Sequence, residues 1–378
     1  MEPIPFHLPD LGPDEEHALI EALRAGQLSA NGTQGKAVED KLAVLTGSAH
    51  ALLVSSATHG LEMALAALDV GPGEEVLCPS FGFPSVPNAI LSRGAQPLFV
   101  DIKDNTLSLN EEDATTVVSD QTAAVIPVDY GGVGCNVTAL RAALPHDDIP
   151  VIQDAAHGMG ATRGGSHLGT EADVGVISFH ATKNITSGEG GVLLVREDKI
   201  AQRIEVMRDK GTNRSSFLRG EVPHYEWVDE GSSNGLSDLL AALLAVQLDR
   251  LEEITATRCA IVDRYREEFS DLFEKGLLIP QTVPPECQPN GHLFVIRTTD
   301  KEGCDSLRKH LADQGIPAPF HFAPLHTSRY AKDHLPPQRD LPVTERVWRT
   351  LLRLPVHTHL SDDDQSRIID AVHRGFHE

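Results

Sequence analysis

Lys183 is a candidate for covalent chemistry. It is the lysine of residues 180–184 (HATKN), a polar segment that separates two apolar, β-branched runs at 174–179 and 191–195. Short apolar runs bounded by glycine are typical of strands in a covered sheet, so we expect this lysine where a strand ends and a loop begins. Desolvation there removes part of the charge of an amine, as a lysine that forms a Schiff base requires. From this segment alone, a solvated loop lysine is the alternative.

Asp154 and His157 follow another apolar run, 150–154, in the segment QDAAHGMG. A carboxylate opposite a heterocyclic nitrogen keeps that nitrogen protonated, as an aldehyde cofactor that acts as an electron sink requires. Because Asp154 and Lys183 both stand at predicted strand ends, with one crossover of chain between them, we expect them to approach one site from neighbouring strands. The alternative is an acid that caps the following turn.

Two further strand ends carry possible ligand contacts. The segment SSATHG begins a predicted helix, so Ser56, Ala57 and Thr58 are expected at a helix N-terminus, which can hold a phosphate group. An ordinary helix cap is the alternative. In CPSFGFPS, Phe81 or Phe83 could stack on a flat cofactor ring, in a chain with only 5% aromatic residues. Plain core packing explains these aromatics equally well.

A basic cluster and two histidines complete the set of candidates. In a strongly acidic chain the cluster could capture a diphosphate, and a solvated charged loop is the alternative. Its members are Arg203, Arg208, Lys210, Arg214 and Arg219. His321 and His326 in PFHFAPLH have no partner at metal-ligand spacing, which favours pocket or structural histidines over zinc ligands.

The elements that must position these residues alternate between strands and helices from residue 51 onward. Helical stretches at 56–69, 84–92 and 138–144 separate several of the predicted strands. This alternation predicts a mostly parallel sheet covered on both faces, with ligands beyond the carboxyl ends of its strands. The predicted strands are 51–55, 75–78, 96–100, 123–128, 150–154, 174–179 and 191–195.

The remaining chain suggests a second, smaller domain. A polar stretch without helical or strand period (211–235) leads into a predicted long helix, 237–273, that carries the chain into this domain. The domain contains a predicted strand at 292–297, a helix at 304–314 and a final helix. Ser361 and Asp364 at the start of the final helix fit a capping box.

Composition limits the function classes. The chain has 378 residues and a net charge of −23, which argues against general binding to nucleic acid or membrane surfaces, because both are polyanionic. The five cysteines are scattered without a C-x-x-C pair, which favours reduced thiols in a cytoplasm. The N-terminal segment has no signal-peptide pattern, and no apolar run approaches the length of a membrane span. We therefore expect an acidic cytoplasmic globular protein.

Together these segments resemble the pyridoxal 5'-phosphate-dependent nucleotide-sugar aminotransferases of the DegT/DnrJ/EryC1/StrS family. The resemblance runs almost end to end and is carried by VSSATHGLEMAL, GPGEEVLCPSFGFPSVPNAILSRGAQPLFVDI, IQDAAHGMGA, SFHATKN, GEGG, SDLLAALLAVQLDRL and HFAPLH. It implies an aspartate-aminotransferase-like α/β fold (fold type I), with a mostly parallel sheet in a large domain. We place the N-terminal arm at 1–14, the large domain at 15–250 and the small C-terminal α/β domain at 251–378.

The resemblance also implies roles for single residues. Lys183 resembles the lysine that joins the cofactor covalently and moves a proton during transfer, and Asp154 resembles the partner of the pyridine nitrogen. His157 stands where the family has Gln or His near the cofactor ring, and Phe83 takes the place of the stacking aromatic. The phosphate-binding positions of the family match Ala57, Thr58 and Ser178, although the usual S-G-T reads S-A-T here.

A homodimer with shared active sites is a further implication. In the family an Asn of the neighbouring subunit completes the phosphate site. In GSSNGLSDL, Ser233 aligns with that Asn and Asn234 follows it, so we take Asn234 as the candidate.

The substrate is expected to be a nucleotide sugar, with L-glutamate as amino donor. The segments KGTNRSSFLRG, YEWVDEGSS and SDL resemble the 4-aminotransferases of dTDP-4-keto-6-deoxyglucose, which make dTDP-4-amino-4,6-dideoxygalactose. In this scheme Arg214 and Arg219 face the diphosphate and His326 lies near the sugar. SFHATKN is also similar to enzymes that aminate UDP-4-keto-pentoses, so a 4-keto-pentose is the alternative. A relative that keeps the fold and cofactor but acts as a non-catalytic regulatory protein is the competing class.

Overall fold

The computed structural model describes residues 2–146 and 148–376. Within these ranges no helix is both long and apolar enough to cross a membrane. The elements of the amino-terminal two thirds are α1 Pro13–Ala25, α2 Thr33–Thr46, β1 His50–Val54, α3 Ala57–Ala67, β2 Glu75–Pro79, α4 Ser85–Ser92, β3 Gln96–Val100, α5 Glu111–Thr115, β4 Thr122–Val125, η1 Tyr130–Gly132, α6 Val137–Ala143, β5 Ile152–Asp154, β6 Thr162–Arg163, β7 Ser166–His167, β8 Val174–Ser178, β9 Gly191–Val195, α7 Asp198–Arg208, α8 Arg214–Leu218 and α9 Asp238–Asp249. The remaining elements are α10 Leu251–Glu268, α11 Ser270–Glu274, β10 Ile279–Pro280, β11 Cys287–Gln288, β12 Phe294–Arg297, α12 Lys301–Asp313, η2 Leu325–Thr327, α13 Arg329–His334, α14 Pro342–Thr350, β13 Leu351–Leu354 and α15 Asp362–Arg374.

The central sheet is mostly parallel, as the sequence predicts. Strands β3, β2 and β4 pair in parallel, and a second group has the order β1-β9-β8-β5. Parallel bridges from Val125 to Val151 and from Val128 to Asp154 join the two groups. Because β9 pairs antiparallel with both β1 and β8, it is the reversed strand among those described in this sheet. Strands β5 and β8 are direct parallel neighbours.

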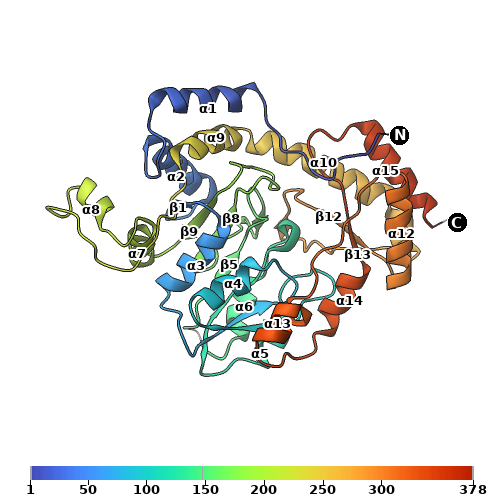
Figure 1. Ribbon diagram of the computed structural model, residues 1–378. Coiled ribbons are helices and arrows are strands. Elements are labelled where there is room, and N and C mark those ends of the chain that lie inside the picture. The colour runs from blue at the N-terminus through green and yellow to red at the C-terminus, as the bar shows by residue number, and fades with distance from the viewer. Residues whose placement is uncertain (1, 147, 377–378) are drawn as a thin grey trace.

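Helices cover both faces of this sheet (Figure 1). Side chains alternate along β1, so that Leu52 and Val54 enter one core together with residues of α3, α4 and α7. Ala51 and Leu53 enter the opposite core, which contains residues of α2 and α9. Burial on both faces explains why the strands read as continuous apolar runs.

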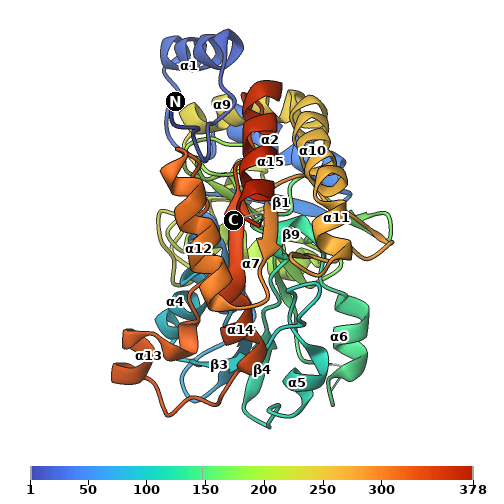
Figure 2. The same ribbon diagram turned by 90° about the vertical axis from the view of Figure 1, so that its right-hand side faces the viewer.

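A smaller unit follows at the carboxyl end. Its sheet has the order β10-β12-β13 with antiparallel pairing, and its core combines residues of α10, α12 and α15. Figure 2 shows α12 and α15 in front of this sheet, and Figure 1 shows α9 and α10 leading into the unit. Ile4 of the N-terminal arm belongs to the same core, so the arm reaches the carboxyl-terminal unit.

Several expected elements have other bounds in the structure, and the expected long helix differs most. The expected helix 237–273 consists of α9, α10 and α11, with breaks at Arg250 (φ −99°, ψ 6°) and Phe269 (φ −96°, ψ 7°). At the first break the Arg250 guanidinium pairs with Asp10 and Glu15 of the amino-terminal region, a long-range contact without a local signal. The polar stretch 211–235 contains the short helix α8, and β12 begins at Phe294 instead of residue 292.

Asp238 at the start of α9 holds α2 in place, and its removal should destabilise the fold. Its buried carboxylate accepts hydrogen bonds from Gln34 N at 3.1 Å and Gly35 N at 2.8 Å, in the first turn of α2. Asp238→Ala leaves both donors without an acceptor, so we expect the free energy of unfolding to fall by about 2–3 kcal/mol in urea titrations. The matched control is Asp249→Ala in the same helix, which removes an exposed ion pair with Lys41 and should cost less than about 1 kcal/mol. Equal effects of both variants would contradict this role.

Candidate active site

A cavity of about 410 Å³ lies at the carboxyl ends of β5 and β8. It brings together residues from distant parts of the sequence, as expected for the edge of a parallel sheet. The sequence-predicted residues that line it are Ser56, Ala57, Thr58, Phe83, Asp154, His157, Ser178, Lys183 and His321. The structure thus places nine of the candidates around one volume, and their roles remain predictions.

The loop that carries Lys183 is fixed by hydrogen bonds on both sides of the lysine. Thr186 Oγ1 donates to Phe179 O at 3.0 Å, and Ala181 N donates to Gly188 O at 2.8 Å. Next to the lysine, the buried Asn184 side chain donates to Asn290 O at 2.9 Å. The base of the lysine side chain is therefore held by both the strand and a distant loop.

Burial tunes the charges of Lys183 and Asp154. Desolvation lowers the pKa of the Lys183 amine to about 8, opposed by the attraction of Asp154. Desolvation also raises the pKa of Asp154, opposed by a hydrogen bond from Ala156 N and by Lys183. Among the described residues Asp154 has no ion-pair partner within 4 Å, so its carboxylate is available to a protonated nitrogen of a ligand.

The N-terminus of α3 lies at one end of the cavity. Ser56 caps the helix by accepting a hydrogen bond from His59 N, so the earlier amides of the first turn keep no intrahelical partner. Gly191 at the start of β9 lies directly against this turn, because a Cβ there would stand 2.7 Å from Ala57 N. Ser178 accepts from His180 N at 3.3 Å and keeps its own proton for a ligand. These donors fit a phosphate group.

His157 enters the cavity as a neutral ring. Its Nδ1 accepts a hydrogen bond from Gly131 N at 3.2 Å, which leaves Nε2 as the donor nitrogen. Desolvation first, and then the charge of Lys183, lower the pKa of His157 well below its usual value. The ring of His292 lies 4.3 Å from that of His157, centroid to centroid.

The two phenylalanines of CPSFGFPS have different environments. Phe81 is fully buried and packs edge-on against Tyr130 at 4.9 Å, so it is a core residue. Phe83 lines the cavity and is 60% exposed, which leaves one aromatic surface free to cover a flat ring. Phe81 thus packs in the core, and Phe83 is the phenylalanine that could stack on a cofactor ring.

His326 lies outside the cavity, contrary to its expected place near the sugar. Its Nδ1 is 2.7 Å from Ser80 Oγ, its backbone N donates to the same oxygen, and its Nε2 is 3.6 Å from Glu345. It is a buried structural histidine. His321, five residues earlier, lines the cavity instead and is 3.0 Å from the Tyr130 hydroxyl.

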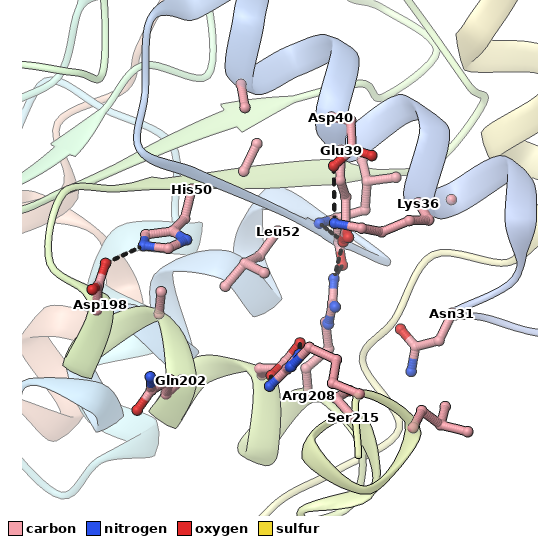
Figure 3. Close-up of a pocket in the computed structure, with 18 of the residues that line it drawn as sticks. Asn31, Lys36, Glu39, Asp40, His50, Leu52, Asp198, Gln202, Arg208 and Ser215 are labelled. Atoms are coloured by element: carbon pink, nitrogen blue, oxygen red, sulfur yellow. Dashed lines mark hydrogen bonds and ion pairs between the residues drawn. The ribbon is translucent and has the colours of Figure 1, made fainter. Parts of the chain in front are cut away.

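Arg214, Arg219 and Asn234 do not line the cavity, contrary to expectation. Arg219 is paired with Glu205 and Glu221 and borders a different pocket of about 600 Å³. Figure 3 shows this pocket, where Arg208 is directed to Glu39 and His50 to Asp198. Acidic side chains outnumber basic ones in its lining, and within the described residues every member of the basic cluster except Arg214 forms an ion pair with an acid.

Four further cavity residues were not predicted from the sequence. Phe6 and His7 come from the N-terminal arm, where His7 donates to Ala181 O at 2.8 Å. Arg258 comes from α10 and Arg353 from β13. The one available hint is Arg353, because a charged residue interrupts the otherwise apolar run LLRL.

The donor set fits pyridoxal 5'-phosphate. An unpaired buried carboxylate suits a pyridine nitrogen, a free helix N-terminus suits a phosphate, and a lysine with a lowered pKa suits an aldehyde carbon. The α/β fold of type I and this site define a pyridoxal 5'-phosphate-dependent aminotransferase.

Comparison with known proteins gives the family. Residues 9–373 match the model of the DegT/DnrJ/EryC1/StrS aminotransferase family, and the chain belongs to this family. It is 30% identical to the aminotransferase TlmJ from Streptoalloteichus hindustanus (TM-score 0.91, 99% of each chain covered). It is 28% identical to DesV from S. venezuelae, solved in complex with a ketimine intermediate (TM-score 0.89, 99% and 98% covered). Spr1654 from Streptococcus pneumoniae, 26% identical and solved in PLP and PMP forms, has a TM-score of 0.90 and coverages of 98–99%.

The lowered pKa of Lys183 predicts a pH profile for cofactor capture by the apo protein. Only the neutral amine attacks an aldehyde, so the rate of covalent capture should rise about tenfold per pH unit and level off above pH 8. Stopped-flow absorbance measures this rate, and Lys183→Ala should show no covalent capture at any pH. A rate that still rises until about pH 10, as for an ordinary lysine, would contradict the shift.

Gly191→Ala should weaken phosphate binding. The new Cβ would lie 2.7 Å from Ala57 N and 2.9 Å from Ser56 C, so the first turn of α3 must move. We expect a loss of about 1–3 kcal/mol in stability and a lower affinity for pyridoxal 5'-phosphate, measured by thermal unfolding with and without the cofactor. Gly71→Ala is the control, because its nearest neighbour is 3.9 Å away. An unchanged cofactor affinity in Gly191→Ala would refute this contact.

Proposed function

We propose that this aminotransferase transfers an amino group from L-glutamate to the C4 ketone of a nucleotide-linked 4-keto-6-deoxy sugar, dTDP-4-keto-6-deoxyglucose. The observation that carries the proposal is the convergence of Lys183, Asp154 and the α3 N-terminus in one cavity, in a chain of the DegT/DnrJ/EryC1/StrS family. The resemblance of KGTNRSSFLRG and YEWVDEGSS to the 4-aminotransferases supports the choice of ketone.

Each residue has a defined task in this reaction. Bound pyridoxal 5'-phosphate supplies an electron sink for the transfer of nitrogen between two carbon skeletons. Lys183 Nζ binds the cofactor covalently before substrate arrives. During transfer the same amine takes a proton from one carbon atom and gives it to another, and a pKa of about 8 lets it do both near neutral pH. Asp154 keeps the ring nitrogen protonated, while the α3 amides and Ser178 hold the phosphate. His157 donates from Nε2 as a neutral ring.

The proposal includes a homodimer that completes each active site. Asn234, Arg214 and Arg219 do not line the Lys183 cavity of their own chain, so we assign their action on the ligands to a partner subunit. In that arrangement Asn234 would contact the phosphate, and the two arginines would face the nucleotide diphosphate.

The proposal is tested by the two half-reactions of the purified holoenzyme. L-Glutamate should remove the visible absorbance of the lysine-linked cofactor, and dTDP-4-keto-6-deoxyglucose should then restore it and yield the 4-amino sugar by mass spectrometry. A UDP-4-keto-pentose serves as the competing acceptor, because one missing carbon changes transition-state binding by only about 1–3 kcal/mol.

Lys183→Ala is the control for both half-reactions and should lower turnover by several orders of magnitude. Preference for the pentose would refute the choice of sugar. A bound cofactor that no amino donor alters would instead favour the non-catalytic regulatory class.

A further inference from the structure

Arg353 is a desolvated cation without an acidic partner among the described residues. It lies on β13 beside the cavity, and its backbone is fixed by pairing with Val295 and by donation to Pro319 O at 3.1 Å. One amine of its guanidinium group donates a hydrogen bond to Phe320 O at 3.1 Å. The buried Nε–H of the same group has no hydrogen-bond acceptor among the described residues. An unpaired buried donor on a charged group is costly, so the site is built to receive an anion.

The N-terminal arm holds this guanidinium in position. The Phe6 ring lies 4.9 Å from the central carbon of the Arg353 guanidinium, within the range of a cation–π contact. The arm is anchored on both sides of this ring, because Ile4 N donates to Gly315 O and His7 donates to Ala181 O. Phe6 therefore limits the rotamers of Arg353 and leaves its fork directed at the cavity.

The other cations of the cavity are committed elsewhere. Lys183 is assigned to the covalent bond with the cofactor. Arg258 donates hydrogen bonds to the carbonyl oxygens of Gly291 and His292, at 3.1 and 3.0 Å. The α3 N-terminus serves the cofactor phosphate. The Arg353 guanidinium remains, with its Nε–H unpaired, and a single guanidinium matches a single carboxylate by paired N–H···O bonds better than it matches a diphosphate with two charged groups.

We propose that Arg353, held by Phe6, binds a carboxylate of the amino donor and so makes an amino acid the donor of this enzyme. The inference rests on the proposed function, because it requires a site that alternates between an amino donor and a keto-sugar acceptor. It assigns the two substrates to different anion sites: the donor carboxylate to Arg353, and the nucleotide diphosphate to another part of the assembly.

The test measures the two half-reactions separately in full-length holoenzyme with Arg353→Gln and Arg353→Lys. With Arg353→Gln the apparent Kd for L-glutamate should rise about 10- to 100-fold, and with Arg353→Lys by less, since the charge remains but the fork is lost. The apparent Kd for the keto-sugar nucleotide and the affinity for pyridoxal 5'-phosphate should stay within about twofold of wild type. Arg346→Gln is the matched control, because Arg346 is an exposed arginine paired with Asp104.

A second variant tests the arm. Phe6→Leu should raise the apparent Kd for L-glutamate by about two- to fivefold, and adding it to Arg353→Gln should cause no further loss. A weaker keto-sugar affinity with unchanged glutamate affinity would assign Arg353 to the diphosphate and overturn the inference. Equal losses in both half-reactions, loss of cofactor binding, or no change at all would overturn it too. If the wild-type enzyme reacts with neither substrate, the proposed function itself fails.

Discussion

The parallel pairing of β5 with β8 is the constraint on which the site depends. Its register sets Asp154 opposite Val176, so the acid at the end of β5 and the loop after β8 leave the sheet at the same edge. A slip of one residue would turn Asp154 to the opposite face, because side chains alternate along a strand. Both strands are completely buried, so such a slip would bring polar groups into two apolar cores and would lower the stability of the fold.

The position of Lys183 depends equally on contacts far away in the chain. Asn184 bonds to Asn290 and His292, and Asn290 in turn donates to His157 O and Met159 O. One short segment from the carboxyl-terminal third thus links the lysine loop to the loop after Asp154. Such hydrogen bonding restrains both loops, which suits a site whose reacting atom must be held in fixed geometry.

The sequence predicts what local patterns encode. Strand ends are visible as apolar runs that stop at polar residues, which is why Lys183 and Asp154 could be placed in one site. The antiparallel insertion of β9 between β1 and β8 has no local signal. Nor could PFHFAPLH reveal that His321 faces the cavity while His326 bonds to Ser80, because the choice depends on how that segment packs against the rest of the chain. The break at Arg250 likewise arises from a contact with the amino-terminal region.

Charge pairing explains why basic residues clustered in sequence form no free cationic patch by themselves in this protein. With a net charge of −23, acids are abundant enough to neutralise most surface cations, as Glu205 and Glu221 neutralise Arg219. The long-range field of such a chain repels anions, but salt screens it beyond about 8–10 Å. Recognition must then occur inside the cavity, where desolvation strengthens each interaction. An anion site in an acidic protein is best sought where a buried cation lacks a partner, and Arg353 meets that condition.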